Sequence, residues 1–438
     1  MIEQLASGAA GLAWALVFFV VALSIIVAVH EYGHYIVGRL CGIGAQVFSI
    51  GFGPVLLSRV DRRGTRWQLA ALPFGGYVKF KGDADPASMQ AQSGDGPEGI
   101  AGESIHRAPL WARAATVFAG PLFNFIMAVL VLAALGLTSG RVVEPLTIGE
   151  VLAPGDLRAG DVVEAVNGLP ASTPDEIAEA GERIPSDQPV TWTVRRDGSS
   201  VEVDGPHPFP PLVRSVSPMS AASETDLQTG DLIRAVNGEP VRTFDELREQ
   251  VGASEGAAVS LDVLRGDEAF EAVLVPRRTD VPQPGGGFES RYLIGIVGGV
   301  PFTPERESIG PIEALAGAAD QFAFLITASL EGMWSILTGA ISTCNINGPI
   351  GIAETSGAMA EEGLSDYIYF LAVLSAAVGL INLFPIPILD GGHLVFHAYE
   401  AVSGRPPSER AVRVLMAGGV AVIAALMVFA LTNDIFCP

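Results

Sequence analysis

The residues with the clearest capacity for chemistry lie in the pentapeptide HEYGH, His30 to His34, at the end of an uncharged apolar run over residues 11–29. On a helix, two histidines four positions apart present their imidazoles one turn apart on the same face. Such a pair supplies two ligands of a zinc site, and the neighbouring Glu31 is placed to act as a general base. The pattern predicts a zinc hydrolase in which His30 and His34 bind the metal.

A third ligand is predicted at Asp390, within the run NLFPIPILDGG over residues 382–392. Two imidazoles and one carboxylate form the protein ligand set of a catalytic zinc, which leaves the fourth position to water. A zinc-bound water has a pKa of about 7, and we expect Glu31 to take its proton and later deliver it to the leaving amine. His393 and His397 repeat the four-residue spacing, but no glutamate lies between them, and the ligand set is complete without them.

The same run carries Pro385 and Pro387, which remove backbone donors and oppose the continuation of a helix. Broken backbone at membrane depth is tolerated where it lines a polar cavity, so we expect Asn382 and Asp390 to face one. A neutral amide can donate to a substrate carbonyl without competing for zinc, which makes Asn382 a candidate for substrate binding. The alternative is a hydrogen bond between membrane helices, a role also open to Asn124.

Composition indicates a membrane protein, because 49% of the 438 residues are hydrophobic and only 17% are charged. A net charge of −22 argues against a nucleic-acid partner, since phosphate contacts need clustered Lys and Arg. The first apolar run has no Lys or Arg before it and no small-residue cleavage site after it, which favours an uncleaved transmembrane helix over a signal peptide. Uncharged spans of membrane length occur at residues 11–29, 114–137, 367–389 and 414–431.

A fifth apolar stretch, residues 315–341, contains Asp320, Gln321 and Glu331 and has an amphipathic pattern, so we expect an interfacial helix there. Basic residues gather in two short loops, which predicts that both loops are cytoplasmic and that the termini and the long central segment lie outside. The basic residues are Arg39, Arg59, Arg62, Arg63, Arg66, Lys79 and Lys81 in the first loop and Arg405, Arg410 and Arg413 in the second. The chain has three widely spaced cysteines, which predict no disulfide framework.

The central segment contains an internal repeat. Residues 157–170 read LRAGDVVEAVNGLP and residues 227–240 read LQTGDLIRAVNGEP, with eight of fourteen positions identical. Each copy predicts a strand, an Asn-Gly turn and a helix capped by Thr173 or Thr243, and each resembles a PDZ domain. Neither copy has the Gly-Leu-Gly-Phe loop that binds a peptide carboxylate, so we favour a spacer or size filter over ligand capture.

Between the first two spans, residues 47–60 and 66–80 read as a Gly-punctuated apolar β-hairpin, and residues 83–103 as a flexible acidic loop. An edge strand of this hairpin would be able to hold an extended substrate. A cytoplasmic hairpin packed on the helix ends is the alternative, and the pattern alone does not choose between them.

Together, the HEYGH motif, the GPLFNF motif at residues 120–125, the tandem repeats and the run at residues 382–392 resemble the site-2 protease family of intramembrane zinc proteases, in its bacterial form with tandem PDZ domains. The resemblance covers essentially the whole chain. It implies that Zn²⁺ is bound by His30, His34 and Asp390 and that Glu31 is the catalytic acid and base. It further implies substrate binding by Asn382 and by a membrane-re-entrant hairpin that includes Gly75, Gly76 and Tyr77.

The resemblance also implies the biological setting, a bacterial inner membrane with the active site toward the cytoplasm and both termini and the PDZ domains in the periplasm. The substrates would be single-span membrane proteins, such as anti-sigma factors and remnant signal peptides, cleaved after a first cut elsewhere. The two rival hypotheses are a membrane-anchored zinc peptidase acting on soluble peptides and a non-catalytic PDZ scaffold with a coincidental HEYGH.

The predicted fold is a polytopic α-helical membrane protein with four transmembrane helices, a membrane-associated β-hairpin and two exported PDZ-like α+β domains. The PDZ pair would reject substrates that still carry a bulky exported domain. The predicted division is 1–38 (first span), 39–113 (hairpin and acidic loop), 114–137 (second span), 138–206 and 207–280 (PDZ-like domains), 281–365 (post-PDZ region with the amphipathic helix), 366–400 (third span), 401–413 (loop) and 414–432 (fourth span).

Overall fold

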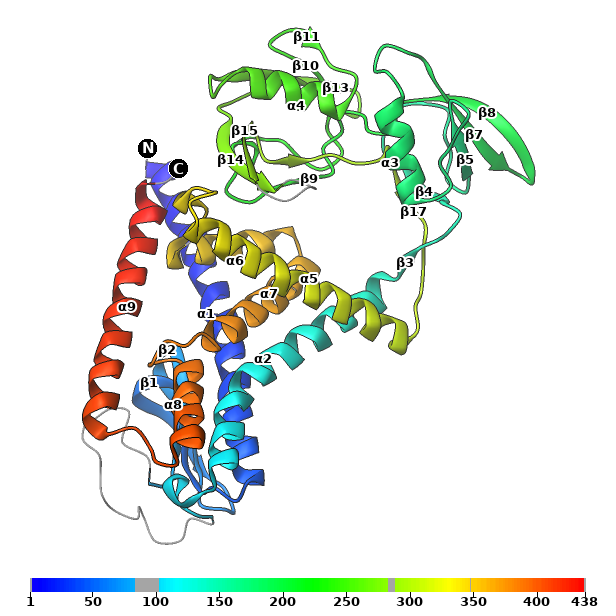
Figure 1. Ribbon diagram of the computed structural model, residues 1–438. Helices are drawn as coiled ribbons and strands as arrows, with labels where there is room; N and C mark the ends of the chain where they lie inside the picture. Colours follow the sequence, from blue (N-terminus) through cyan, green and yellow to red (C-terminus); the bar gives the residue numbers. More distant parts are fainter. Residues whose placement is uncertain (1, 83–101, 283–287, 347, 437–438) are drawn as a thin grey trace. The chain divides into compact units, whose positions relative to one another are not determined.

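A computed structural model describes residues 2–82, 102–282, 288–346 and 348–436 (Figure 1). The predicted acidic loop at residues 83–103 lies almost entirely outside them. The chain divides into two compact units. The first comprises Met1–Leu135, Pro311–Trp334 and Ile346–Cys437, and the second is built from Gly136–Gly310 and Ser335–Asn345.

Within the described residues, four helices are long and apolar enough to cross a membrane, in agreement with the predicted number. They are α1 (Ile2–Leu40, apolar from Ala13), α2 (Leu110–Ser139), α7 (Leu364–Asn382) and α9 (Glu409–Phe436). The amphipathic helix α5 (Pro311–Leu337) is not one of them. A further helix of the first unit, α6 (Pro349–Glu362), was not predicted, and its small buried residues pack against α1.

The third span differs from its prediction over residues 367–389, because its helix stops at Asn382. A turn over residues 383–389 contains Pro385 and Pro387, and a separate helix, α8, then runs from Asp390 to Ser403. Two prolines two residues apart prevent the i to i−4 hydrogen bonds that a continuous helix would need. The break that was expected at this point therefore separates two helices, and Asp390 is the first residue of the second.

The apolar hairpin consists of β1 (Ala45–Val60) and β2 (Arg66–Phe80), and each strand bends and pairs twice. Phe48 pairs with both Val78 and Trp67, so the hairpin forms four neighbouring segments in the order 76–80, 45–50, 66–70 and 55–60. The bend in β1 lies at Gly51, whose φ of +89° is in the left-handed region. A Cβ there would lie 2.8 Å from the Leu72 carbonyl oxygen, so the fold-over needs a glycine. The outer edges of this small sheet are segments 76–80 and 55–60.

The second unit contains the two repeats, and each has a four-stranded sheet with the same strand order and one helix. Thr173 and Thr243 cap these helices, because their hydroxyl oxygens accept hydrogen bonds from the backbone N–H of Glu176 and Glu246. The first sheet has the order β6-β5-β7-β8 and the second β11-β10-β12-β13. The bounds are β5 (Val162–Val166), β6 (Leu169–Pro170), α3 (Pro174–Arg183), β7 (Val190–Arg196), β8 (Ser199–Gly205), β10 (Leu232–Val236), β11 (Glu239–Pro240), α4 (Phe244–Ala253), β12 (Val259–Arg265) and β13 (Glu268–Leu274).

After the second repeat, a hairpin of β14 (Arg277–Pro282) and β15 (Phe288–Leu293) leads the chain back to complete both repeats. Phe302 is fully buried in the core of the first repeat, 6.1 Å from the Trp192 ring. The structure thus extends the first repeat beyond the predicted residues 138–206. The returning strands pair as β16 (Ile296–Val297) with β9 (Ser215–Val216), β17 (Phe302–Pro304) with β4 (Ile148–Val151) and β18 (Arg306–Glu307) with β3 (Arg141–Val142).

The cysteines differ from expectation in one respect. Cys344 is disulfide-bonded, whereas Cys41, which follows α1, is free. The sequence spacing did not indicate this bond, because a disulfide depends on distance in the fold rather than along the chain.

Candidate metal centre

The three predicted metal ligands lie together in the first unit. His30 and His34 project from α1, and Asp390 is the first residue of α8. One ligand atom from each lies within 4.8 Å of the other two. Asp390 Oδ2 is 3.0 Å from His30 Nε2 and 3.5 Å from His34 Nε2, and the two Nε2 atoms are 3.1 Å apart.

The geometry of these three atoms fits a metal better than it fits mutual hydrogen bonding. Although the distances are those of an ion pair, Asp390 Oδ2 is buried and has no hydrogen bond of acceptable geometry. Ligands about 2.0–2.1 Å from a tetrahedral zinc would be separated by about 3.3 Å, close to the three distances found. The three atoms are therefore spaced as the ligands of one bound cation would be.

A second feature that fits a bound metal is the absence of a side chain at Gly120 in α2. A Cβ at this position would lie 2.3 Å from His34 Nε2 and 2.8 Å from His30 Nε2, the two nitrogens that face the metal position. Gly33 lets the helices approach, because a Cβ there would lie 2.4 Å from the Ala119 carbonyl oxygen. Only glycine leaves the ligand atoms accessible at this crossing of α1 and α2.

Both imidazoles are also oriented by α2. His34 Nδ1 lies 2.8 Å from the Thr116 carbonyl oxygen, to which it donates, and this leaves the Nε2 lone pair for a metal. His30 Nδ1 lies 3.2 Å from the side-chain amide of Asn124, which is fully buried. If His30 Nε2 binds a metal, the proton of the imidazole is on Nδ1. The Asn124 amide must then turn its Oδ1 toward Nδ1 to accept a hydrogen bond from it.

Asp390 is held in place by close backbone packing and by an ion pair. A Cβ on Gly391 would lie 2.2 Å from the Leu383 carbonyl oxygen, so the turn before α8 folds tightly against the start of that helix. Further along α8, Glu400 forms a two-pronged ion pair with Arg113 of α2, at 2.7 and 3.1 Å. Residues 113, 116, 120 and 124 follow helical i+3 and i+4 spacing, so one stripe of α2 contacts both histidines and the helix that begins at Asp390.

Glu31 lies beside the ligands but is not one of the clustered ligand set. Its carboxylate interacts with the backbone of Val78 in β2, and a Cβ on Gly76 would lie 3.2 Å from Glu31 Cγ. The hairpin segment 76–80 is thus the neighbour of the predicted acid and base.

The other predicted residues have separate contacts. Asn382 ends α7, and its amide donates to the Val378 carbonyl oxygen at 3.0 Å; no contact described for the chain joins it to the ligands. Tyr77 stacks on Phe52 with ring centroids 6.0 Å apart, and Gly75 has a φ of +127°. His393 and His397 lie on α8 and do not join the ligand cluster found among the described residues.

Comparison with known proteins decides the family. The model of peptidase family M50 matches residues 18–426. The chain belongs to peptidase family M50. A candidate zinc metalloprotease of Agrobacterium fabrum is 36% identical over 420 residues, covering 95% of the chain and 94% of that protein. The Regulator of sigma-E protease RseP of Escherichia coli is 33% identical, covering 96% of the chain and 98% of that protein.

The resemblance to the site-2 protease family is therefore confirmed, and the protein is a zinc metalloprotease with Zn²⁺ as its cofactor. Among solved structures, a PDZ domain of an SdrC-like protein from Listeria monocytogenes covers 20% of the chain at 22% identity, with a TM-score of 0.15. That score is too low to establish a shared fold.

The sequence did not point to the contributions of Arg113, Thr116 and Gly120. Thr116 acts through its carbonyl oxygen and Gly120 through the absence of a side chain. The available signal was the spacing of these residues with Asn124 along a single face of a membrane helix.

Proposed function

We propose that this metalloprotease hydrolyses peptide bonds within transmembrane segments of single-span membrane proteins that have already been cut once. The observation that carries the proposal is the convergence of His30, His34 and Asp390 at the end of the apolar helix α1. Ionisable groups at such a place are costly unless they are paired or serve a function. A peptidase for soluble peptides would have no need of this position.

The residues divide the chemistry among them. His30, His34 and Asp390 would hold Zn²⁺, which when bound supplies a Lewis acid and lowers the pKa of its water. Glu31 would accept a proton from the attacking water and deliver it to the leaving amine. The Thr116 carbonyl and the Asn124 amide would fix the tautomer and ring orientation of the two histidines.

The substrate would lie as an extended strand along segment 76–80 of the hairpin. A helical substrate hides its scissile carbonyls in internal hydrogen bonds, and an edge strand supplies replacement bonds when the helix unwinds. Segment 76–80 is an outer edge of the hairpin sheet, and Gly76 brings its backbone next to Glu31. We assign Gly75, Gly76 and Tyr77 to this substrate edge, and Asn382 to the substrate carbonyl.

We place the protein in a bacterial inner membrane, with both loops of basic residues in the cytoplasm. Two cysteines support this orientation, because disulfides persist in oxidising compartments. The free Cys41 follows α1 on the predicted cytoplasmic side, and the oxidised Cys344 belongs to the second unit, which would be periplasmic. Anti-sigma factors and remnant signal peptides are the substrates that fit this arrangement.

The central test compares wild type, Glu31→Gln and Asp390→Asn in detergent, with zinc content and cleavage of a model transmembrane peptide as readouts. Glu31→Gln should keep about one zinc per chain and lose at least 100-fold in turnover. Asp390→Asn should lose zinc as well as activity. Equal cleavage by wild type and Glu31→Gln would refute the assignment of the general base. An undiminished zinc content in Asp390→Asn would refute the assignment of Asp390 as the third ligand.

We further propose that the two repeats are PDZ-like domains that act as a size filter. Because Val142 and Arg306 are paired across β3 and β18, residues 143–305 can be replaced by an Asn-Gly turn that closes a short hairpin. The deletion variant should cleave a substrate that still carries its exported domain, whereas the full-length protein should leave that substrate uncut. A Glu31→Gln version of the deletion is the control, and loss of cleavage of a trimmed substrate would contradict the filter role.

A further inference from the structure

The hairpin and its flanking residues carry a charge opposite to that of the rest of the protein. Residues 41–82 contain six basic residues and one acidic residue, a net charge of +5 in a chain of net charge −22. Four of the six are arginines on or beside the turn that joins β1 to β2, and all four are exposed. They are Arg59, Arg62, Arg63 and Arg66.

The single acid of this segment does not neutralise these arginines. The Asp61 carboxylate accepts hydrogen bonds from the backbone N–H of Arg63 and Thr65, from Trp67 Nε1 and from the Tyr35 hydroxyl, at 2.8–3.2 Å. Within the part of the chain that the structure describes, none of the four guanidinium groups forms an ion pair. Among the described residues, the turn therefore presents four arginines without an ion-pair partner.

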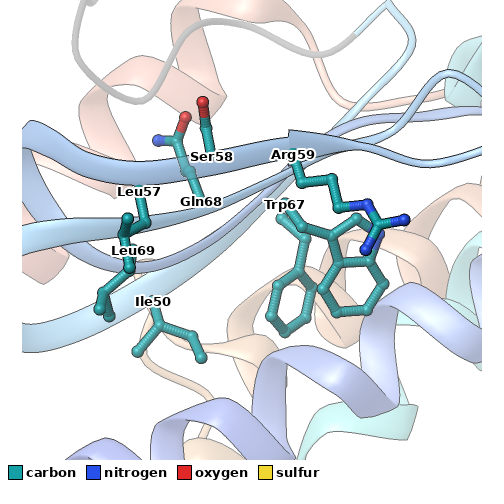
Figure 2. Close-up of a pocket in the computed structure, with 8 residues that line it drawn as sticks. Ile50, Leu57, Ser58, Arg59, Trp67, Gln68 and Leu69 are labelled. Carbon is teal, nitrogen blue, oxygen red and sulfur yellow. The ribbon is translucent and has the colours of Figure 1, made fainter.

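Next to these cations, one face of the hairpin sheet is hollowed into an apolar groove of about 430 Å³ (Figure 2). Two cross-strand rows line it, one of Ile50, Leu69 and Leu57, and the other of Phe48, Trp67 and Arg59. Ser58 and Gln68 also line the groove, and Figure 2 shows their side chains pointing to the opposite face of the sheet.

The groove is open on the side of the edge segment 55–60. Leu57 and Leu69 are 69% and 40% exposed, whereas Phe48 is buried, with its ring 4.4 Å from that of Trp67. Trp67 has its indole N–H bonded to Asp61 at the turn, so its polar edge is at the charged end of the groove. An amphipathic ligand would find an apolar surface beside a cationic rim.

We infer that this groove binds an anionic phospholipid. One acyl chain would cover Ile50, Leu57 and Leu69, and the phosphate would rest on the Arg59 guanidinium, whose planar fork matches a phosphate. The charge is what selects the occupant, because an apolar groove alone would accept any lipid chain. The basic loops indicate the cytoplasmic side for this hairpin, where its cations would meet the anionic headgroups of that leaflet.

The test uses the full-length protein in detergent micelles and a phosphatidylglycerol with a fluorescent acyl chain. Binding is measured by fluorescence anisotropy and compared with that of a phosphatidylcholine carrying the same chain. Wild type should prefer phosphatidylglycerol, and soluble glycerol phosphate should not displace it, since the phosphate alone leaves the groove empty. Equal affinity for the two lipids, or displacement by glycerol phosphate at similar concentrations, would overturn the inference.

Variants separate the headgroup contact from the groove. Arg59→Gln should weaken phosphatidylglycerol binding about fivefold or more and leave phosphatidylcholine binding unchanged. Arg405→Gln makes the same charge change in the other basic loop and should alter neither. Leu57→Asn should weaken the binding of both lipids, because it removes apolar surface from the groove. Identical effects of Arg59→Gln and Arg405→Gln would reduce the site to bulk electrostatics and contradict the inference. Unchanged melting temperatures, expected at exposed positions, exclude unfolding as the cause.

Discussion

The role of Asn124 leads to the sharpest quantitative prediction. The side-chain amide of Asn124 lies 3.2 Å from His30 Nδ1, and the residue is fully buried where α1 and α2 cross. Asn124→Ala would leave the His30 Nδ1–H without an acceptor in a buried site, at a cost of about 1–3 kcal/mol. Loss of a partner of a metal ligand typically lowers metal affinity about 10–100-fold, or about 1.4–2.7 kcal/mol, and the two estimates agree.

The assay is competition for zinc between the purified protein and a chromophoric chelator at pH 7. Asn124→Ala should bind zinc 10–100-fold more weakly than wild type. Asn124→Asp should restore the affinity, because a carboxylate accepts the same hydrogen bond. The fold around position 124 is otherwise retained, since Ser375 donates to the main-chain oxygen of residue 124 at 2.9 Å and not to its side chain.

The matched control is Asn382→Ala, another asparagine of the membrane unit, which has no described contact with the ligands. It should leave zinc affinity unchanged and lower the rate of cleavage. Wild-type zinc affinity in Asn124→Ala would refute the orientation of His30 by this residue. Equal losses in Asn124→Asp and Asn124→Ala would contradict the acceptor role, because aspartate keeps both the volume and the oxygen acceptor of asparagine.

Two further predictions follow from the packing and charge of other residues. Gly120→Ala should abolish stoichiometric zinc binding, measured by metal analysis, because its methyl group would overlap the two Nε2 atoms; Gly418→Ala, where a Cβ meets open space, is the control. Asp161→Asn should lower the melting temperature of the second unit at pH 7, since it removes the charge that pairs with Arg196 at 2.6 Å. Burial alone would raise the Asp161 pKa, but hydrogen bonds from Arg196 and the Arg158 backbone hold it below its ordinary value. The stabilisation is therefore present above about pH 4 and is lost as the pH falls further, so melting curves of wild type and variant should converge at low pH.

The clustering of His30, His34 and Asp390 was predictable because its signals are local. HEYGH places two histidines on one helix face by their spacing, and Asp390 follows two prolines that end a membrane helix. The end of that helix was misplaced by seven residues, since residues 383–389 are apolar and a count of apolar residues ignores the prolines. Helix α6 gave little signal, because its buried face consists of small residues.

What the sequence did not indicate depends on contacts between distant segments. Thr116 and Gly120 act through the backbone, so their roles cannot be inferred from their residue types. Phe302 reads as an isolated apolar residue, yet it fills the core of a repeat whose other buried residues lie more than a hundred positions earlier. Pairing at such separations is set by the three-dimensional fold and leaves no periodic pattern in the sequence.

The return of β17 to the first repeat has a consequence for synthesis. A ribosome delivers residues in order, so the core around Trp192 stays open until Phe302 and the strand that contains it have emerged. The second repeat, whose own closing strand ends at Val297, is available earlier. The repeat made first is therefore completed last, and a chain truncated between the two returning strands would expose an unpaired β4 and an unfilled core to quality-control proteases.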